Sequence, residues 1–210
     1  MGAREVVRCF KMVAARDVPN IVEHGLHAPR WEQLVWVDPK DVRQAVRGIP
    51  GREWRSGQVV DDGWLDLATP IDEVPKVNCS VLHWRDSVPW ELTGIFEYML
   101  DRIERGAGGD GCRNIVDLRR RYAKLDEIFV QVSRERRLRS QRELMKGPSF
   151  RGLGEIRVHI GPDAEPIFGG AGAHRLAMAQ VLGLDVIPAR VGLVHPSALA
   201  SWQDLASGGP

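Results

Sequence analysis

The clearest alternation of apolar and polar residues lies near the C-terminus of the chain. Residues 156–160 read IRVHI, and an apolar residue at every second position is typical of a strand with one buried face. The turn sequence GPD follows at 161–163, and residues 166–168 (PIF) predict a second short strand. A glycine-rich segment, 169–172, then precedes an apolar helical pattern. Over residues 154–195 we therefore predict strand, turn, strand, glycine loop, helix and return strand.

Shorter signals come from the N-terminal half. Residues 34–37 (LVWV) predict a strand. Asp38 and Pro39 have the chemistry of a helix N-cap and first helical position, so we expect a short helix from there through Val46.

Two helices are predicted in the middle of the chain. Residues 90–105 carry apolar side chains at spacings of three and four, and the glycines at 106–109 end this amphipathic helix. Asn114 is expected to cap a long second helix, with Asp117 three residues on. Its apolar stripe consists of Ile115, Leu118, Tyr122, Leu125, Phe129 and Val132.

These patterns predict an α+β fold with a small mixed β-sheet and a mostly helical N-terminal part. With 210 residues the chain has room for one large or two small domains. We expect an N-terminal region of strand, helix and loop at 1–89 and a helical region at 90–150. The hairpin, glycine loop, helix and return strand form a core at 151–210, which we expect to pack with 113–150.

The formal net charge of +1 conceals an uneven distribution. Residues 113–151 contain twelve Lys or Arg and five acids, a local charge of +7, so the remainder carries −6. Such a block suits an anion-facing surface, including one for nucleic acid. The alternative is a solvated helix face whose acids pair with the arginines at helical spacing.

Cysteine content and hydropathy indicate the setting. Cys9, Cys79 and Cys112 are far apart and include no C-x-x-C pair, which favours a reduced, cytoplasmic environment. No run of 18 apolar residues occurs, so we expect no membrane-spanning helix and no membrane partner.

The glycine loop is the strongest candidate for chemistry. Glycines before a helix let backbone N–H groups face an anion, and the helix dipole favours negative charge there. Arg175 would lie in the first turn, where its guanidinium can donate two hydrogen bonds to a phosphate. No Lys follows the glycines, so this is not the phosphate-binding loop G-x-x-x-x-G-K-[ST]. The alternative without a ligand is a tight turn into an ordinary helix, with Arg175 paired to a surface acid.

Histidines outside this motif give further candidate positions. His159 is expected to point outward on its strand, close to the glycine loop. His24 and His27 lie three apart in HGLH, but no Cys or carboxylate follows at a fitting spacing, so we predict no metal site.

The segment 172–175 (GAHR), with Leu182–Gly183 and Ile187–Pro188, resembles the ParB/sulfiredoxin superfamily over roughly residues 125–195. A looser similarity links the chain to uncharacterised ParB-like nuclease-domain proteins through Trp64–Leu65–Asp66, Trp90–Glu91–Leu92–Thr93, Gly111–Cys112 and the segment 140–144 (SQREL). The resemblance implies that a nucleotide (ATP, ADP or CTP) with Mg²⁺ is bound by Gly170, Gly172, His174 and Arg175. Ala173 occupies the position of the catalytic cysteine of sulfiredoxin, so we expect no sulfinic acid reductase activity.

Three functions follow from these observations. The first is a nucleotide-phosphate-binding protein, with kinase and nucleotide hydrolase as the candidate activities. His174, Glu155 and Asp163 are then the catalytic candidates, because phosphoryl transfer needs a carboxylate near the phosphates. The second is a ParB-like nucleic-acid-binding protein or nuclease that uses 113–151. The third is a regulatory protein that keeps the fold without the chemistry.

Overall fold

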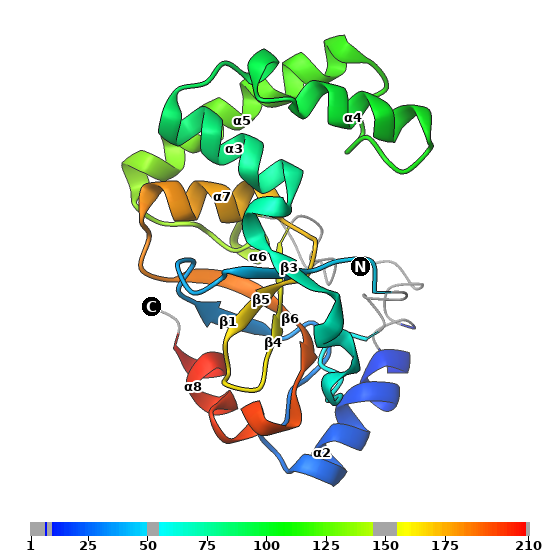
Figure 1. Cartoon of the computed structure of the whole chain (residues 1–210). Helices are drawn as coiled ribbons and strands as arrows, with labels where there is room; N and C mark the ends of the chain where they lie inside the picture. Colours follow the sequence, from blue (N-terminus) through cyan, green and yellow to red (C-terminus); the bar gives the residue numbers. More distant parts are fainter. Residues whose placement is uncertain (1–6, 8–9, 50–54, 145–154, 209–210) are drawn as a thin grey trace. The chain divides into compact units, whose positions relative to one another are not determined.

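Six strands form one mixed β-sheet in the computed structural model, which describes residues 7, 10–49, 55–144 and 155–208 (Figure 1). The described residues also form seven α-helices, so the chain is a mixed α/β protein. It divides into two compact units. The sheet unit comprises Met1–Ile71, Arg139–Gly172 and Asp185–Pro210, and the helical unit comprises Asp72–Leu138 and Ala173–Leu184.

The sheet is built from strands of both halves of the chain, in the order β1-β6-β4-β5-β2-β3. Pairing is antiparallel for β1 with β6, β4 with β5 and β2 with β3, and parallel for β4 with β6 and β5 with β2. The bounds are β1 Leu34–Val37, β2 Gln44–Val46, β3 Ala68–Pro70, β4 Ile156–Ile160, β5 Pro166–Phe168 and β6 Ile187–Val194.

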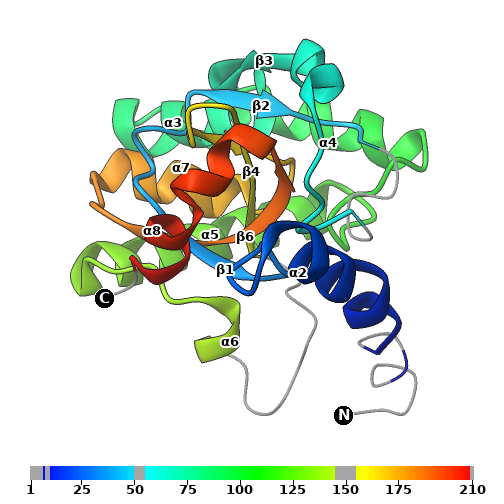
Figure 2. The same ribbon diagram turned by 90° about the horizontal axis from the view of Figure 1, so that it is seen from below.

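Short helices complete the sheet unit. Helix α8 packs beside β1 (Figure 2), and its Trp202 is buried. The side-chain amide of Asn20 donates to the carbonyls of Pro29 and Gly57 at 2.6 and 2.7 Å, which fixes the N-terminal helix on the unit. The helices are η1 Val13–Asp17, α2 Val18–His24, η2 Asp62–Leu67, α6 Gln141–Leu144, η5 Pro196–Ala200 and α8 Trp202–Ser207.

The helical unit has its own apolar core. Helix α3 packs on α7 and α4, and α5 packs on α4 and α7. Leu118 and Tyr122 of the α5 stripe are fully buried in this core. The bounds are α3 Pro75–Asp86, η4 Trp90–Leu92, α4 Ile95–Glu104, α5 Ile115–Glu135 and α7 Ala173–Leu182, and η3 Ile71–Glu73 leads in from the sheet unit.

Several sequence predictions are confirmed. Strand 34–37 and the series hairpin, helix and return strand occur where expected. The turn in the hairpin is closed by the Gly161 N–H, which donates to Glu165 O at 3.0 Å. Asn114 Oδ1 accepts from the N–H groups of Val116 and Asp117, so the predicted cap is present. The helix expected over 90–105 is a 3-10 turn followed by α4.

One local prediction is wrong. Residues 38–46 do not form a helix: Asp38 accepts the N–H of Lys40 in a turn, and residues 44–46 pair as β2 between β5 and β3. Ala45 and Val46 are buried there, so tertiary pairing overrides the local helix signal. The N-terminal part thus combines its helices with three strands, β1, β2 and β3, of the sheet.

The compact units also differ from the ranges expected for 1–89, 90–150 and 151–210. Helix α7 belongs to the helical unit, although the strands before and after it belong to the sheet unit. The chain thus crosses between units at Gly172 and again after Leu184, which no composition shift in the sequence marks.

Candidate anion-binding site

The glycine loop at 169–172 lies against strand β4 within the sheet unit. Gly170 and Gly172 have φ angles of +80° and +76°, which favour glycine. A Cβ atom at Gly172 would lie 2.6 Å from the Cα of Ile156. The Gly169 N–H donates to Arg157 O at 2.7 Å, and the Arg157 N–H donates to Ala171 O at 3.2 Å. Close backbone packing therefore accounts for these glycines, and the Gly169 N–H is not available to a ligand.

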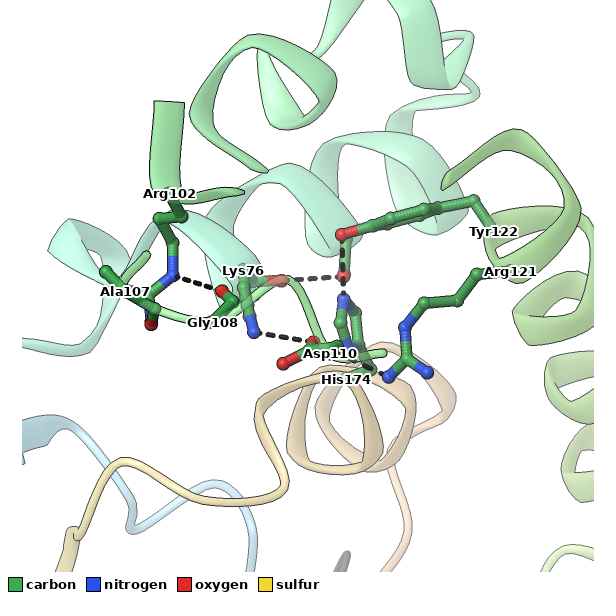
Figure 3. Close-up of polar contacts among 9 residues, drawn as sticks. Lys76, Arg102, Ala107, Gly108, Asp110, Arg121, Tyr122 and His174 are labelled. Atoms are coloured by element: carbon green, nitrogen blue, oxygen red, sulfur yellow. Dashed lines mark hydrogen bonds and ion pairs between the residues drawn. The ribbon is translucent and has the colours of Figure 1, made fainter. Parts of the chain in front are cut away.

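The histidine of the first turn of α7 points into the helical unit. His174 is buried, and its Nε2 lies 3.3 Å from the Tyr122 hydroxyl (Figure 3). Burial, and then the nearby charges of Lys76 and Arg121, lower the pKa of His174 to about 3. The ring is therefore neutral at physiological pH. The neutral ring can donate or accept a hydrogen bond, but it brings no positive charge to a phosphate. A pKa this low also makes His174 a weak general base at neutral pH.

Three charged side chains from different elements meet near His174. Lys76 Nζ of α3 lies 2.6 Å from Asp110 Oδ2, and a guanidinium nitrogen of Arg121 on α5 lies 3.5 Å from the same oxygen (Figure 3). We call Lys76, Asp110, Arg121 and His174 the cation cluster. With His174 neutral its formal charge is +1, because two cations share one carboxylate.

The electrostatics of the cation cluster keep Asp110 ionised. Burial alone would raise the pKa of Asp110. The hydrogen bond from Lys76 and the charges of Lys76 and Arg121 outweigh that effect, so the pKa lies below its ordinary value. The side chains of Lys76, Asp110 and Arg121 are 19%, 30% and 35% exposed, so the cluster reaches solvent. The buried Nε of Arg121 has no hydrogen-bond partner among the described residues.

The residues expected to act together are divided between the two compact units. Gly170 and Gly172 belong to the sheet unit, whereas His174 and Arg175 belong to α7 of the helical unit. Arg175 is partly exposed in the first turn of α7. Glu155 is buried at the glycine-loop end of β4, and its carboxylate accepts the Gln141 N–H at 2.7 Å.

Asp163 lies in the hairpin turn, at the end of β4 and β5 opposite to the glycine loop. It lines a cavity of about 540 Å³. The charged residues of this cavity are four carboxylates and one guanidinium: Asp38, Asp41, Asp163, Glu165 and Arg43. Such an acidic lining disfavours a phosphate. Because Asp163 lies at the opposite end of the hairpin, the structure brings it together with neither Glu155 nor the glycine loop.

The remaining histidines have structural surroundings. His159 is buried and its Nδ1 accepts the Leu193 N–H at 2.8 Å, so it does not point outward. His24 and His27 line a cavity of about 150 Å³ beside Trp202. In the described part of the chain no three His, Cys, Asp or Glu residues are grouped so that they could hold a metal ion.

The basic block is partly paired. Lys124 and Glu127 form an ion pair at 2.6 Å, and Arg119 lies 3.8 Å from Glu91. The Arg136 guanidinium donates to Leu182 O at 2.6 Å and so satisfies a backbone carbonyl at the C-terminal end of α7. Lys146 and Arg151 lie outside the described residues. Of these contacts, only the Lys124–Glu127 pair has the helical spacing expected for a solvated helix face.

Comparisons with known proteins leave the family open. No family model matches the chain, and no solved structure matches it. Over 122 residues, 56% of this chain, the sequence is 26% identical to peptide chain release factor 3 of Aromatoleum aromaticum (strain DSM 19018 / LMG 30748 / EbN1). The chain spans about a fifth of the length of that relative, since the match covers 21% of it. None of the described helices is long and apolar enough to span a membrane.

Proposed function

We propose that this protein binds a phosphate-bearing small molecule, a nucleotide in the first place, at the first turn of α7. Lys76 and Arg121 supply the positive charge. The observation that carries the proposal is the cation cluster itself: two partly exposed cations from α3 and α5 share the single carboxylate of Asp110 beside His174.

Helix α7 adds to the attraction for an anion. It has ten residues and no acid in its first turn, so the partial positive charge at its N-terminus is not offset by a carboxylate of that turn. Arg175 lies in the same turn and is partly exposed. The neutral ring of His174 adds no charge, so we assign it to orienting the turn through Tyr122 rather than to proton transfer.

The choice of a nucleotide rests on the resemblance to the ParB/sulfiredoxin superfamily, whose members include binders of ATP, ADP and CTP. The described residues form no metal cage of their own. Magnesium would therefore enter with the phosphates, as it commonly does when a protein supplies only one or two ligands. Neither Glu155 nor Asp163 belongs to the cation cluster, so we propose binding and assign no catalytic carboxylate.

A ligand screen tests this function. We would measure the melting temperature with ATP, ADP, CTP and GTP, each with magnesium, at several concentrations. A ligand present at about 100 times its Kd adds roughly 2.7 kcal/mol to stability, which gives a clear shift. A concentration-dependent shift with one or more nucleotides, lost in Lys76→Ala but kept in Lys124→Ala, supports the proposal. No shift with any nucleotide in the wild type counts against it.

A further inference from the structure

The cation cluster is already occupied by a carboxylate of the protein itself. We infer that Asp110 is an internal competitor that holds the place of the ligand's phosphate group between Lys76 and Arg121. A phosphate must displace it to bind. The inference rests on the proposed function, and it identifies the group that the site recognises as a terminal phosphate.

The contacts of Asp110 show what it replaces. A single oxygen, Oδ2, lies within 2.6 Å of Lys76 Nζ and within 3.5 Å of the Arg121 guanidinium. Nothing in the described residues accepts a hydrogen bond from the buried Nε of Arg121. The carboxylate thus contacts both cations, but its single charge neutralises only one of them, and it leaves part of the guanidinium fork unused.

A phosphate group fits these donors better than the carboxylate does. Its tetrahedral oxygens can accept from Lys76 and, through two parallel hydrogen bonds, from the guanidinium of Arg121. Its greater negative charge also balances two cations rather than one. Exchange of Asp110 for a phosphate therefore adds a hydrogen bond at the buried Nε of Arg121.

The segment that carries Asp110 connects α4 to α5 and is also rich in glycine, but it is separate from the glycine loop at 169–172. Gly106, Gly108 and Gly111 have positive φ angles, and so does Asp110 itself, at 54°. Around Gly111, nothing lies within 4 Å of the place where a Cβ would stand.

The base of the loop is held more firmly than its tip. Arg102 donates to the carbonyls of Ala107 and Gly108. Gly109 lies against Ile103, where a Cβ would approach a side-chain carbon to 2.5 Å. The open space at Gly111 leaves room for Asp110 to swing away from Lys76 and Arg121 while Gly109 stays in place.

The test is to remove the charge of Asp110 and keep its shape. We would measure the Kd of ATP and of inorganic pyrophosphate by titration calorimetry for wild type and Asp110→Asn. Asp101→Asn is the matched control, because it removes one carboxylate from α4 that pairs with Arg105 rather than with the cation cluster. We expect Asp110→Asn to bind both probes about tenfold more tightly or better, the factor set by one charge-assisted hydrogen bond that is no longer contested. Asp101→Asn should bind like the wild type.

The outcomes separate this inference from the proposed function. Wild-type binding with equal or weaker binding by Asp110→Asn overturns the inference and leaves the phosphate site standing. Binding by Asp110→Asn alone supports the inference but contradicts nucleotide binding by the wild-type protein. No binding by either protein, with both folded by circular dichroism, contradicts both. If Asp110→Asn does not fold, Asp110→Gly replaces it, since glycine suits the positive φ at this position.

Discussion

His174 and Tyr122 are 52 residues apart in the sequence, yet the His174 Nε2 lies 3.3 Å from the Tyr122 hydroxyl. Their rings meet edge to face, with centroids 5.4 Å apart. Burial raises the pKa of Tyr122 and lowers that of His174, so both groups are neutral at physiological pH. The contact joins the first turn of α7 to α5 and positions that turn next to Lys76 and Arg121.

The neutral state of His174 makes stability depend on pH. Its pKa falls from the ordinary 6.5 in the unfolded chain to about 3 in the fold, so the unfolded state binds the proton more readily. The stabilisation is complete above about pH 6.5 and is lost as pH falls toward 3. Between about pH 7 and pH 4 the loss attributable to this group is roughly 3 kcal/mol.

The pH prediction is checked with His174→Gln, which keeps a hydrogen-bonding side chain but does not titrate. Urea unfolding at several pH values should show a smaller acid-dependent loss in the variant than in the wild type. Other carboxylates protonate in the same range, so the difference between the two proteins is the readout. Parallel curves for the two proteins would contradict the neutral, buried His174.

The glycine loop gives a prediction about packing. Gly172 has a positive φ, and a Cβ there would meet the backbone of Ile156. Gly183 also has a positive φ, 58°, but nothing lies within 4 Å of its Cβ position. Gly183→Ala should therefore cost only the left-handed strain of about 1–2 kcal/mol. Gly172→Ala should cost clearly more, as measured by urea unfolding, and equal losses would show that the approach to β4 is not tight.

Arg157 of β4 and Arg190 of β6 are partners in the parallel pairing, and each donates to a different oxygen of Glu32. The three side chains are 8%, 11% and 12% exposed. Glu32→Gln removes the negative charge that two nearly buried guanidinium groups share, and we expect a loss of about 3–5 kcal/mol. Glu23→Gln, on a 74% exposed side chain, should change little in the same unfolding assay. A loss of unfolding free energy below about 1 kcal/mol for Glu32→Gln, the range of a surface pair, would contradict a buried, stabilising ion-pair network at Glu32.

Much of the fold was predictable because its signals are local. The alternation in 156–160, the Asn114 cap and the apolar stripe of α5 all use residues within one turn or one strand. The burial of β4 was predicted incompletely for a physical reason. We expected one buried face, but all five of its residues are buried, because Arg157 finds Glu32 and His159 finds the Leu193 N–H. Such partners lie 34 to 125 residues away.

The cation cluster was not predicted, since Lys76 and Arg121 come from two different helices and Asp110 from the connection between α4 and α5. The local signals are weak: Pro75 marks the start of α3, and Asp110 is flanked by glycines. Arg121 was counted only as one of twelve basic residues in 113–151. Only the packing of α3, α5 and α7 brings these charges to His174.

The pairing within the basic block leads to a prediction about nucleic acid. Lys124 and Arg119 face Glu127 and Glu91, so we expect weak or no binding to duplex DNA. Fluorescence anisotropy with a labelled duplex of about 30 base pairs, at about 50 and 200 mM salt, covers the range in which phosphate-dominated binding loses orders of magnitude. Submicromolar affinity at the higher salt would favour the nucleic-acid-binding function over the nucleotide site.

The measurement that tests the central claim most directly is nucleotide affinity after removal of the cations of the site. We would titrate wild type, Lys76→Ala, Arg121→Gln and Arg175→Ala with the nucleotide that gives the largest shift in the thermal screen. The control Lys124→Ala removes an equally charged residue from α5. A charge-assisted hydrogen bond contributes about 1.5–3 kcal/mol, so each of the three variants should bind roughly tenfold more weakly or worse, while Lys124→Ala binds like the wild type. Equal affinities in all five folded proteins would contradict a phosphate site at the first turn of α7.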